Sequence, residues 1–187
     1  IFSTAATSRA ATQRSAGTIV TPQRLFGTLA DGAVLVDFLT YERSAPIEGR
    51  VEARRERRVV AFVLDATGVR KRVELGPEAE IESAVDAWRA GLGRDRASLA
   101  AADKLRQTIW LPLEPLLGKT EVVLISPDGA LGRLPFAALP GAKPNSYLLE
   151  EYTLVTIPVP RVLAEAPERD PADELADFGD VLLVGGI

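Results

Sequence analysis

The stretch at residues 121–141, EVVLISPDGALGRLPFAALPG, decides the fold. It opens with four consecutive aliphatic residues at 122–125, and an unbroken run of this kind is typical of a strand covered on both faces. Residues 126–129, SPDG, then end the strand, because proline fixes its own φ and glycine accepts a positive φ. The apolar residues that follow are interrupted by glycine and proline, which argues against an ordinary helix. We therefore predict a buried central strand, a tight turn and a packed return.

The composition is that of an ordinary globular protein. The chain has 187 residues, of which 47% are hydrophobic and 26% charged, enough for one domain or one and a part. The formal net charge of −4 does not favour nucleic acid or an anionic membrane as a partner. No apolar run approaches the roughly 18 residues that span a bilayer, and no signal peptide is evident. We expect a cytoplasmic protein without a membrane partner.

Two residue types are missing, and their absence limits the chemistry. The sequence contains no cysteine and no histidine. It can therefore supply neither a thiolate nucleophile nor a disulfide, and it lacks the commonest general base and metal ligand. We expect no cofactor, no metal and no catalytic residue in this chain. The chain also begins at Ile1 without methionine and ends on a strand-like VLLVGGI, so we expect it to be a segment of a longer protein.

The remaining patterns indicate strands and helices in an α/β arrangement. Strands are expected at 33–41, 58–66 and 69–75, as an antiparallel meander whose last strand lies near an edge, and again at 152–157 and 181–184.

A helix beginning at Gly76-Pro77 is expected to present one apolar face, made by Ile81, Ala84, Val85, Trp88 and Leu92. A second is expected to be capped by Ser98, to turn Leu105, Ile109 and Leu113 inward, and to be bent or ended by Pro112 and Pro115. Short helices are expected at 21–29 and 161–166. The predicted fold class is α/β, with a mixed, largely buried sheet flanked by helices.

The connection at 42–57 is strongly charged, and we predict an exposed loop there. It includes a basic run with Arg54, Arg55 and Arg57, which raises the question of nucleic-acid binding. Interleaved glutamates and the lack of aromatic stacking residues argue against direct contact with nucleic acid.

Several polar residues could in principle carry chemistry. A metal site or an acid/base pair would need two of the strand-end carboxylates to converge, which the spacing does not require; these are Asp37, Asp65, Asp128 and Asp180. Turn formation and capping explain them adequately. Ser126 ends a strand, but no G-x-S-x-G elbow surrounds it, and only a pair with Lys119 or Lys143 remains open. The glycines after 181–184 could open a dinucleotide fingerprint, although the third glycine and its helix are lacking.

The ordered motifs resemble the CHAT family, which are caspase-like cysteine peptidase domains usually found with tetratricopeptide repeats. The resemblance covers about residues 25–186 and rests on the P-D-G turn, the L-P-F-x-A-L block, the Tyr-Leu pair at 147–148 and the L-L-V-G-G run. The motif residues, which we expect to be structural, are Pro127, Asp128, Gly129, Leu134, Pro135, Phe136, Leu139, Tyr147, Gly185 and Gly186.

The resemblance implies two caspase-like halves, with the catalytic His and Cys in the second half, downstream of the L-L-V-G-G run. This chain then corresponds to the non-catalytic first half, which would brace and regulate the second. We expect a linker or helical tail at 1–20, the caspase-like half at 21–166, an acidic linker at 167–178, and the first strand of the catalytic half at 179–187. The implied partners are the downstream half, the upstream repeat region and a protein substrate.

Two other functions stay open. The chain could be a non-enzymatic interaction or scaffold module of caspase-like fold, which a parent protein without His and Cys after the L-L-V-G-G run would favour. It could also be a nucleotide-binding α/β domain, which would need a glycine-rich continuation beyond Ile187.

Overall fold

The structure is a computed structural model that describes residues 21–46, 53–91 and 94–165. The predictions for 1–20, 167–178 and 179–187 lie outside these residues, as do those for Leu92, Asp180, Gly185 and Gly186. Across the described ranges, no helix combines the length and apolarity needed to cross a membrane.

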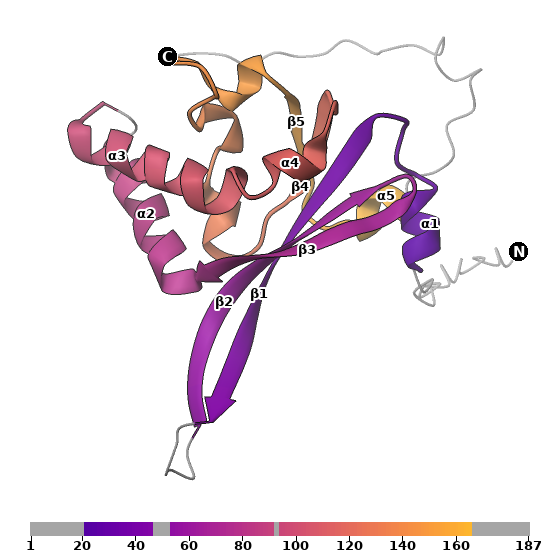
Figure 1. The fold of residues 1–187 in the computed structure, drawn as a ribbon, viewed down its shortest axis with the longest axis horizontal. Helices are drawn as coiled ribbons and strands as arrows, with labels where there is room; N and C mark the ends of the chain where they lie inside the picture. Colours follow the sequence, from indigo (N-terminus) through magenta and orange to yellow (C-terminus); the bar gives the residue numbers. More distant parts are fainter. Residues whose placement is uncertain (1–20, 47–52, 92–93, 166–187) are drawn as a thin grey trace, which may run out of the picture.

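The fold is built on one mixed five-stranded sheet in the order β3-β2-β1-β4-β5 (Figure 1). The strands are β1 (Ala33–Pro46), β2 (Ala53–Asp65), β3 (Gly68–Pro77), β4 (Val122–Ser126) and β5 (Thr153–Thr156). The first three form antiparallel pairs, whereas β4 runs parallel to both β1 and β5. The predicted mixed sheet and the antiparallel meander with its third strand at an edge are both confirmed.

Strand β4 occupies the position that its sequence predicts. Val123 and Ile125 are fully buried in the main core on one face of the sheet, and Leu124 packs against a second, smaller cluster on the other. Because both faces are covered, a continuous aliphatic run is stable there. The strand ends at Ser126, directly before the Pro127-Asp128-Gly129 turn.

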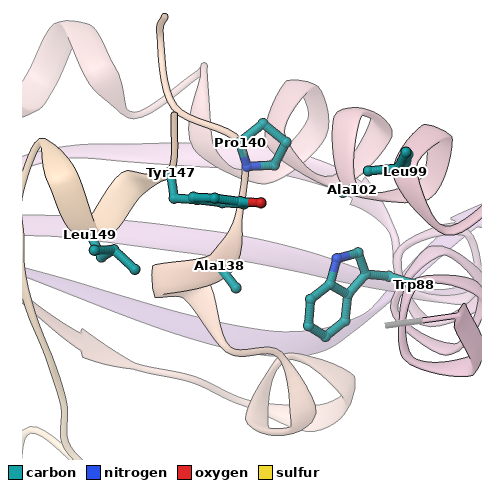
Figure 2. A pocket seen from close by; sticks show the side chains of 7 residues that line it. All are labelled: Trp88, Leu99, Ala102, Ala138, Pro140, Tyr147 and Leu149. Carbon is teal, nitrogen blue, oxygen red and sulfur yellow. The ribbon is translucent and has the colours of Figure 1, made fainter. Parts of the chain in front are cut away.

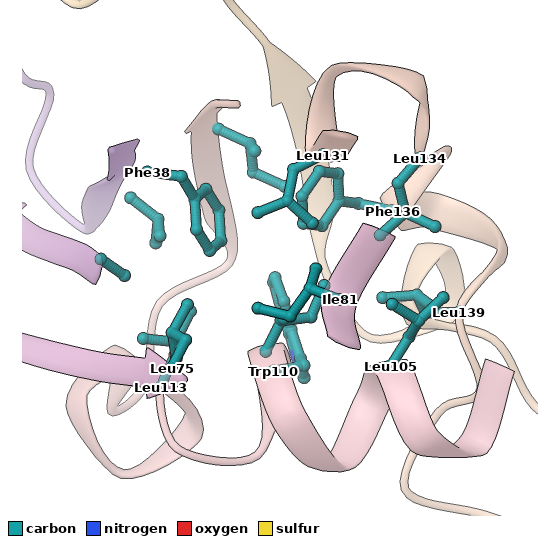
Figure 3. Packing of buried hydrophobic residues seen from close by; sticks show 14 of the residues in the cluster. Phe38, Leu75, Ile81, Leu105, Trp110, Leu113, Leu131, Leu134, Phe136 and Leu139 are labelled. Atoms are coloured by element: carbon teal, nitrogen blue, oxygen red, sulfur yellow. The ribbon is translucent and has the colours of Figure 1, made fainter. Parts of the chain in front are cut away.

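Helices α2 (Glu78–Gly91) and α3 (Arg96–Leu105) contribute to the main core, together with α4 (Glu114–Leu117). Helix α2 buries the predicted residues Ile81, Ala84, Val85 and Trp88. A π-helical turn, η1 (Arg106–Trp110), continues α3, and the helical run breaks before α4 in the region of the two prolines, as predicted. Figure 3 shows side chains from these helices meeting those of the segment after β4.

The predicted cap of α3 is wrong by three residues. The N-cap is Asp95, whose carboxylate accepts a hydrogen bond of 2.7 Å from the backbone amide of Ser98. The hydroxyl of Ser98 in turn accepts a hydrogen bond from the Asp95 backbone amide at 3.3 Å. Ser98 is therefore the third helical residue of a capping box, in which two amides at the helix start are satisfied reciprocally.

The opposite face of the sheet carries the second cluster and two short helices, α1 (Pro22–Phe26) and α5 (Arg161–Glu165). The buried residues there are Leu29, Leu35, Leu64 and Ile157, with Leu25 and Leu163 packed against them. The predicted short helices are thus present; α1 is shorter than the predicted 21–29, and α5 is helical over all of the predicted residues that the structure describes.

The predicted loop at 42–57 is also wrong for the residues that the structure describes. The β1–β2 ladder continues without a register shift to the pair of Pro46 and Ala53, and Figure 1 shows this hairpin projecting from the rest of the fold. Its charges alternate and pair across the ladder, as with Glu42 and Arg55 at 3.5 Å. A strand whose two faces are both exposed can consist largely of charged residues, because these residues pair with charges on the neighbouring strand. A strongly charged sequence therefore does not exclude a strand.

Candidate functional site

The turn after β4 is tied to the centre of the sheet by Asp128. One carboxylate oxygen accepts a hydrogen bond of 2.7 Å from the backbone amide of Thr40 in β1. The other accepts one of 2.8 Å from the amide of Gly129, which starts a 3-10 helix, η2 (Gly129–Arg133). Asp128 therefore extends the contact between β1 and β4 beyond their last paired residues, Asp37 and Ser126. This is a capping role, as the sequence indicated.

Gly129 needs to be glycine for two reasons. Its φ is +56°, a conformation that side-chain-bearing residues rarely adopt. A Cβ atom would also lie 3.0 Å from a carboxylate oxygen of Glu78 and 3.1 Å from the hydroxyl of Thr40. The turn consequently brings three elements, β1, β4 and α2, into close contact.

Most of the apolar motif residues after the turn belong to the core. Leu131, Leu134, Phe136 and Leu139 are buried, and the ring of Phe136 stacks on Phe38 with centroids 5.4 Å apart (Figure 3). The backbone there forms η2 and a second 3-10 turn, η3 (Phe136–Ala138). The sequence correctly argued against an ordinary helix in this segment. Pro135 is exposed and Pro127 half-buried, consistent with backbone-shaping roles.

Tyr147 differs from the apolar motif residues of the core because it is half exposed. It precedes a further 3-10 turn, η4 (Leu148–Glu150), and its backbone amide donates to the Glu150 carboxylate at 2.9 Å. Its neighbour Leu148 is fully buried, and the Leu148 amide donates to the carbonyl of Leu139 at 2.9 Å. The backbone is thus fixed on one side while the Tyr147 ring remains available on the other.

The Tyr147 ring lines a concave apolar surface that we call the Tyr147 groove. Its volume is about 260 Å³, and Figure 2 shows its lining side chains: Trp88, Leu99, Ala102, Ala138, Pro140, Tyr147 and Leu149. Leu99, Tyr147 and Leu149 are 53%, 50% and 58% exposed, unusually high values for large apolar side chains in contact with one hollow. A second hollow of about 370 Å³ continues past Leu99 and Tyr147 along residues 140–146. The groove can accept apolar side chains but contains no nucleophile.

Arg106 holds the loop beside the groove in place. Its Nε donates to the carbonyl of Pro140 at 2.8 Å, and its Nη2 pairs with the carboxylate of Glu114 at 2.7 Å. The Arg106 side chain is only 13% exposed, so this ion pair is partly shielded from solvent. Sequence reasoning missed this residue, because the main contact is to a backbone carbonyl 34 positions away, for which no local pattern exists.

Two of the candidate carboxylates do come near each other. Asp37 lies in β1 opposite Ser126, the last residue of β4, and Asp128 follows two residues later in the turn. Burial raises the pKa of Asp37, a hydrogen bond from Ser126 offsets part of this, and the charge of Asp128 raises the pKa further. Asp65 instead accepts hydrogen bonds from the amide and hydroxyl of Thr67, at 3.0 and 2.6 Å, in a local turn. Over residues 21–46, 53–91 and 94–165, no three metal-binding side chains are grouped to hold an ion.

Ser126 is not placed like an exposed nucleophile. It is 4% exposed, and its hydroxyl interacts with the Asp37 carboxylate on the same face of the sheet. This arrangement satisfies a buried carboxylate and does not present an oxygen to substrate. The hypothesis of a serine nucleophile therefore gains nothing from the structure.

Among the comparisons with known proteins, one family model matches part of the chain. Residues 99–185 match the model of the CHAT domain, a range that includes most of α3, all of β4, and every motif residue except Gly186. No curated protein and no solved structure matches the chain. The likeness to caspases in particular stays a prediction from the sequence.

Proposed function

With residues 99–185 identified as part of a CHAT domain, we propose that this chain is the non-catalytic portion of a CHAT-type cysteine peptidase. In this proposal it braces and regulates a downstream half that carries the catalytic His and Cys. The observation that carries the proposal is the combination of the family match with a sequence that contains neither residue. A peptidase of this type needs a thiolate and a base, so these 187 residues act through their fold.

The positions of the motif residues in the turn and the core support a bracing role. Asp128, Gly129, Phe136 and Leu139 serve the turn and the core, where they fix the position of the segment after β4. Such residues determine where backbone and surface lie, and none is arranged as an acid, base or nucleophile. The chemistry would then come from the downstream half, with a protein as substrate and the cytoplasm as the compartment.

The Tyr147 groove supports the regulatory part of the proposal. An apolar hollow with three large, half-exposed side chains is typical of a surface that contacts another polypeptide. We propose that other parts of the same protein, the downstream half or an upstream repeat region, act as partners of this chain. The alternative is a scaffold module without catalysis, and the same groove would serve that role equally well.

The test uses the parent protein, including the sequence that continues after Ile187. We expect a thiol-reactive peptide probe to label one cysteine in the continuation and none in residues 1–187. Substitution of that cysteine by alanine should abolish both labelling and peptide hydrolysis. A continuation without His and Cys, or hydrolysis that survives the alanine substitution, would refute the peptidase proposal; the first outcome favours the scaffold.

A further inference from the structure

The outer part of the β1–β2 hairpin stands apart from the sheet. Pairing of β1 with β4 ends at Asp37, and pairing of β2 with β3 ends at Arg58. Within the part of the chain that the structure describes, residues 42–46 and 53–57 pair only with each other. Figure 1 shows this two-stranded ribbon projecting from the fold. A ribbon of two strands is marginal in water by itself, so a further contact would stabilise it.

The arginines of this ribbon fall into two groups. Arg57 pairs with Glu78 of α2 at 2.8 Å, and Arg58 pairs with Glu56 at 2.9 Å. Arg43 and Arg54, by contrast, have no ion pair with any residue that the structure describes, and both are exposed. In the ladder they are diagonal neighbours, because Arg43 lies opposite Glu56 and Arg54 opposite Ala45. Two cations at this spacing can bind carboxylates of one extended segment.

Strand alternation places these two arginines on the ribbon's continuation of the sheet face that carries α5. The β1–β2 register is uninterrupted, so Arg43 shares a face with Leu35, eight residues earlier, and Arg54 shares one with Leu64. Leu35 and Leu64 pack in the cluster that includes Leu163 of α5. Leu39 lies between, on the same face, and is 47% exposed. We call Leu39, Arg43 and Arg54 the arginine face.

The sequence that follows α5 has the complementary charge. Residues 166–180, APERDPADELADFGD, contain six acidic residues and one arginine, with Leu175 and Phe178 among them. The described part of helix α5 ends at Glu165, on the sheet face that continues into the arginine face of the ribbon. Eight residues of strand span about 26 Å, and fifteen residues of extended chain reach up to roughly 50 Å. The acidic segment is therefore long enough to reach the ribbon.

We propose that residues 168–180 bind the arginine face of the β1–β2 ribbon. Carboxylates of the segment pair with Arg43 and Arg54, and an apolar side chain of the segment covers Leu39. Single exposed ion pairs are weak, but a tethered segment has an effective concentration of about millimolar, so several weak contacts act together. Three carboxylates on this face do not prevent binding, because Glu56 and Glu74 already pair with arginines and Asp37 is half-buried beside Ser126.

An acidic protein segment fits this face better than a nucleic acid does. Glu42 and Glu56 interrupt the basic run, and Tyr41 is engaged, with its hydroxyl donating to Glu74 at 2.8 Å and Arg72 over its ring. Nucleic-acid binding surfaces combine continuous positive charge with free aromatic rings. The proposal concerns regulation by the chain's own acidic segment and does not depend on the peptidase function.

Carbodiimide coupling of the full 187-residue chain tests the proposal. The variant Arg54→Lys keeps the charge and adds an amine that couples to nearby carboxylates, and mass spectrometry identifies the joined peptides. We expect position 54 to couple to residues 168–180. The yield should fall by about tenfold in 1 M salt, where the Debye length is about 3 Å. Coupling of position 54 to the segment should be abolished by three substitutions made together, Asp173→Asn, Glu174→Asn and Asp177→Asn. Lys119 and Lys143 are matched internal controls.

Three outcomes would overturn the proposal. One is equal coupling of residues 168–180 to Lys119, Lys143 and position 54, because it would show no preference for the ribbon. Another is unchanged amide hydrogen exchange of residues 168–180 in the charge-reversed variant Arg43→Glu/Arg54→Glu. The third is binding of a fluorescent single-stranded DNA by the wild-type chain, lost in the same variant, without any coupling to the acidic segment. None of these readouts measures peptidase activity. A result that overturns binding of the acidic segment therefore leaves the proposed function untouched.

Discussion

The carboxylate of Asp128 accepts a hydrogen bond of 2.7 Å from the backbone amide of Thr40, which lies 88 residues earlier in the chain. This contact joins the turn after β4 to β1 at the centre of the sheet. It explains why an aspartate follows the strand, since a carboxylate there satisfies two backbone amides at once.

Replacing Asp128 should weaken the fold without changing its architecture. Asp128→Ala leaves the partly buried Thr40 amide without its partner, and we expect a loss of about 1–3 kcal/mol in the free energy of unfolding. Asp128→Asn keeps one side-chain oxygen as an acceptor, so we expect it to lower the free energy of unfolding by less than Asp128→Ala does. Urea denaturation followed by circular dichroism measures both. Equal stability of Asp128→Ala and wild type would contradict the assigned role.

Gly129 and Gly132 provide a matched pair of substitutions in one 3-10 helix. Gly129→Ala places a residue with a side chain at φ = +56° and directs its Cβ toward Glu78 and Thr40. We therefore expect the free energy of unfolding to fall by about 1–2 kcal/mol or more. Gly132→Ala meets no atom within 4 Å and should change stability by less than about 0.5 kcal/mol. Thermal unfolding of the two variants is the measurement. Similar losses in both would show that the turn geometry is not the cause.

The core role of the motif phenylalanine can be separated from the groove beside it. Phe136 is 3% exposed and stacks on Phe38, so Phe136→Ala should cost about 3–5 kcal/mol by loss of buried area and cavity formation. Leu149 is 58% exposed, and Leu149→Ala should be neutral within about 0.5 kcal/mol. Chemical denaturation compares them. A stable Phe136→Ala variant would remove the argument that the motif is structural.

The buried carboxyl of Asp37 predicts a pH dependence of stability. Its pKa is raised by burial, so the folded state holds its proton at a pH where the unfolded chain has lost it. The contribution of this group to the free energy of unfolding therefore rises as pH falls from neutral through the raised pKa toward the ordinary value. Asp37→Asn should remove this component and stabilise the protein at neutral pH. Identical pH profiles for the variant and wild type would show that Asp37 is not the source.

Sequence patterns predicted the elements whose signals are local and missed those that depend on distant partners. The predictions of β4 from its aliphatic run and of α2 from its apolar stripe are confirmed, because burial of one or both faces of an element leaves a recognisable pattern of apolar residues. The sequence predicts a loop where the ribbon continues beyond Tyr41, because charged residues that pair across a hairpin do not show the hydrophobic alternation of a half-buried strand. The prediction of Ser98 as the cap is wrong because Asp95 and Ser98 can both cap a helix, and only the geometry distinguishes them.

The candidate site was harder to predict than the fold. Tyr147 was identified through the family motif, but its groove needs Trp88 from α2 and Leu99 from α3, which no spacing in the sequence brings together. Arg106 acts on the Pro140 carbonyl and Glu114, and the nearness of Asp37 to Asp128 follows from the parallel pairing of β1 and β4. Such contacts arise from topology and leave no local pattern.

The groove should matter for function rather than stability. In the parent protein, Tyr147→Ala and Leu149→Asp should reduce the coupling of this chain to the rest of the molecule, while thermal unfolding of the isolated chain changes little, because both side chains are at least half exposed. Peptide hydrolysis by the parent and the thermal unfolding of the isolated variants are the two readouts. The exposed Val162→Asp on α5 serves as a control away from the groove. Full activity of both groove variants would exclude the groove as a functional contact.

Peptide hydrolysis by the parent protein, compared with and without residues 1–178, is the decisive test of the bracing and regulating role. We expect the deletion to abolish hydrolysis or to remove its regulation. We expect the separately purified 187-residue chain, inactive by itself, to restore regulated hydrolysis when it is added back. Hydrolysis that is unchanged in rate and regulation after the deletion would contradict the claim that this chain braces and regulates a catalytic half.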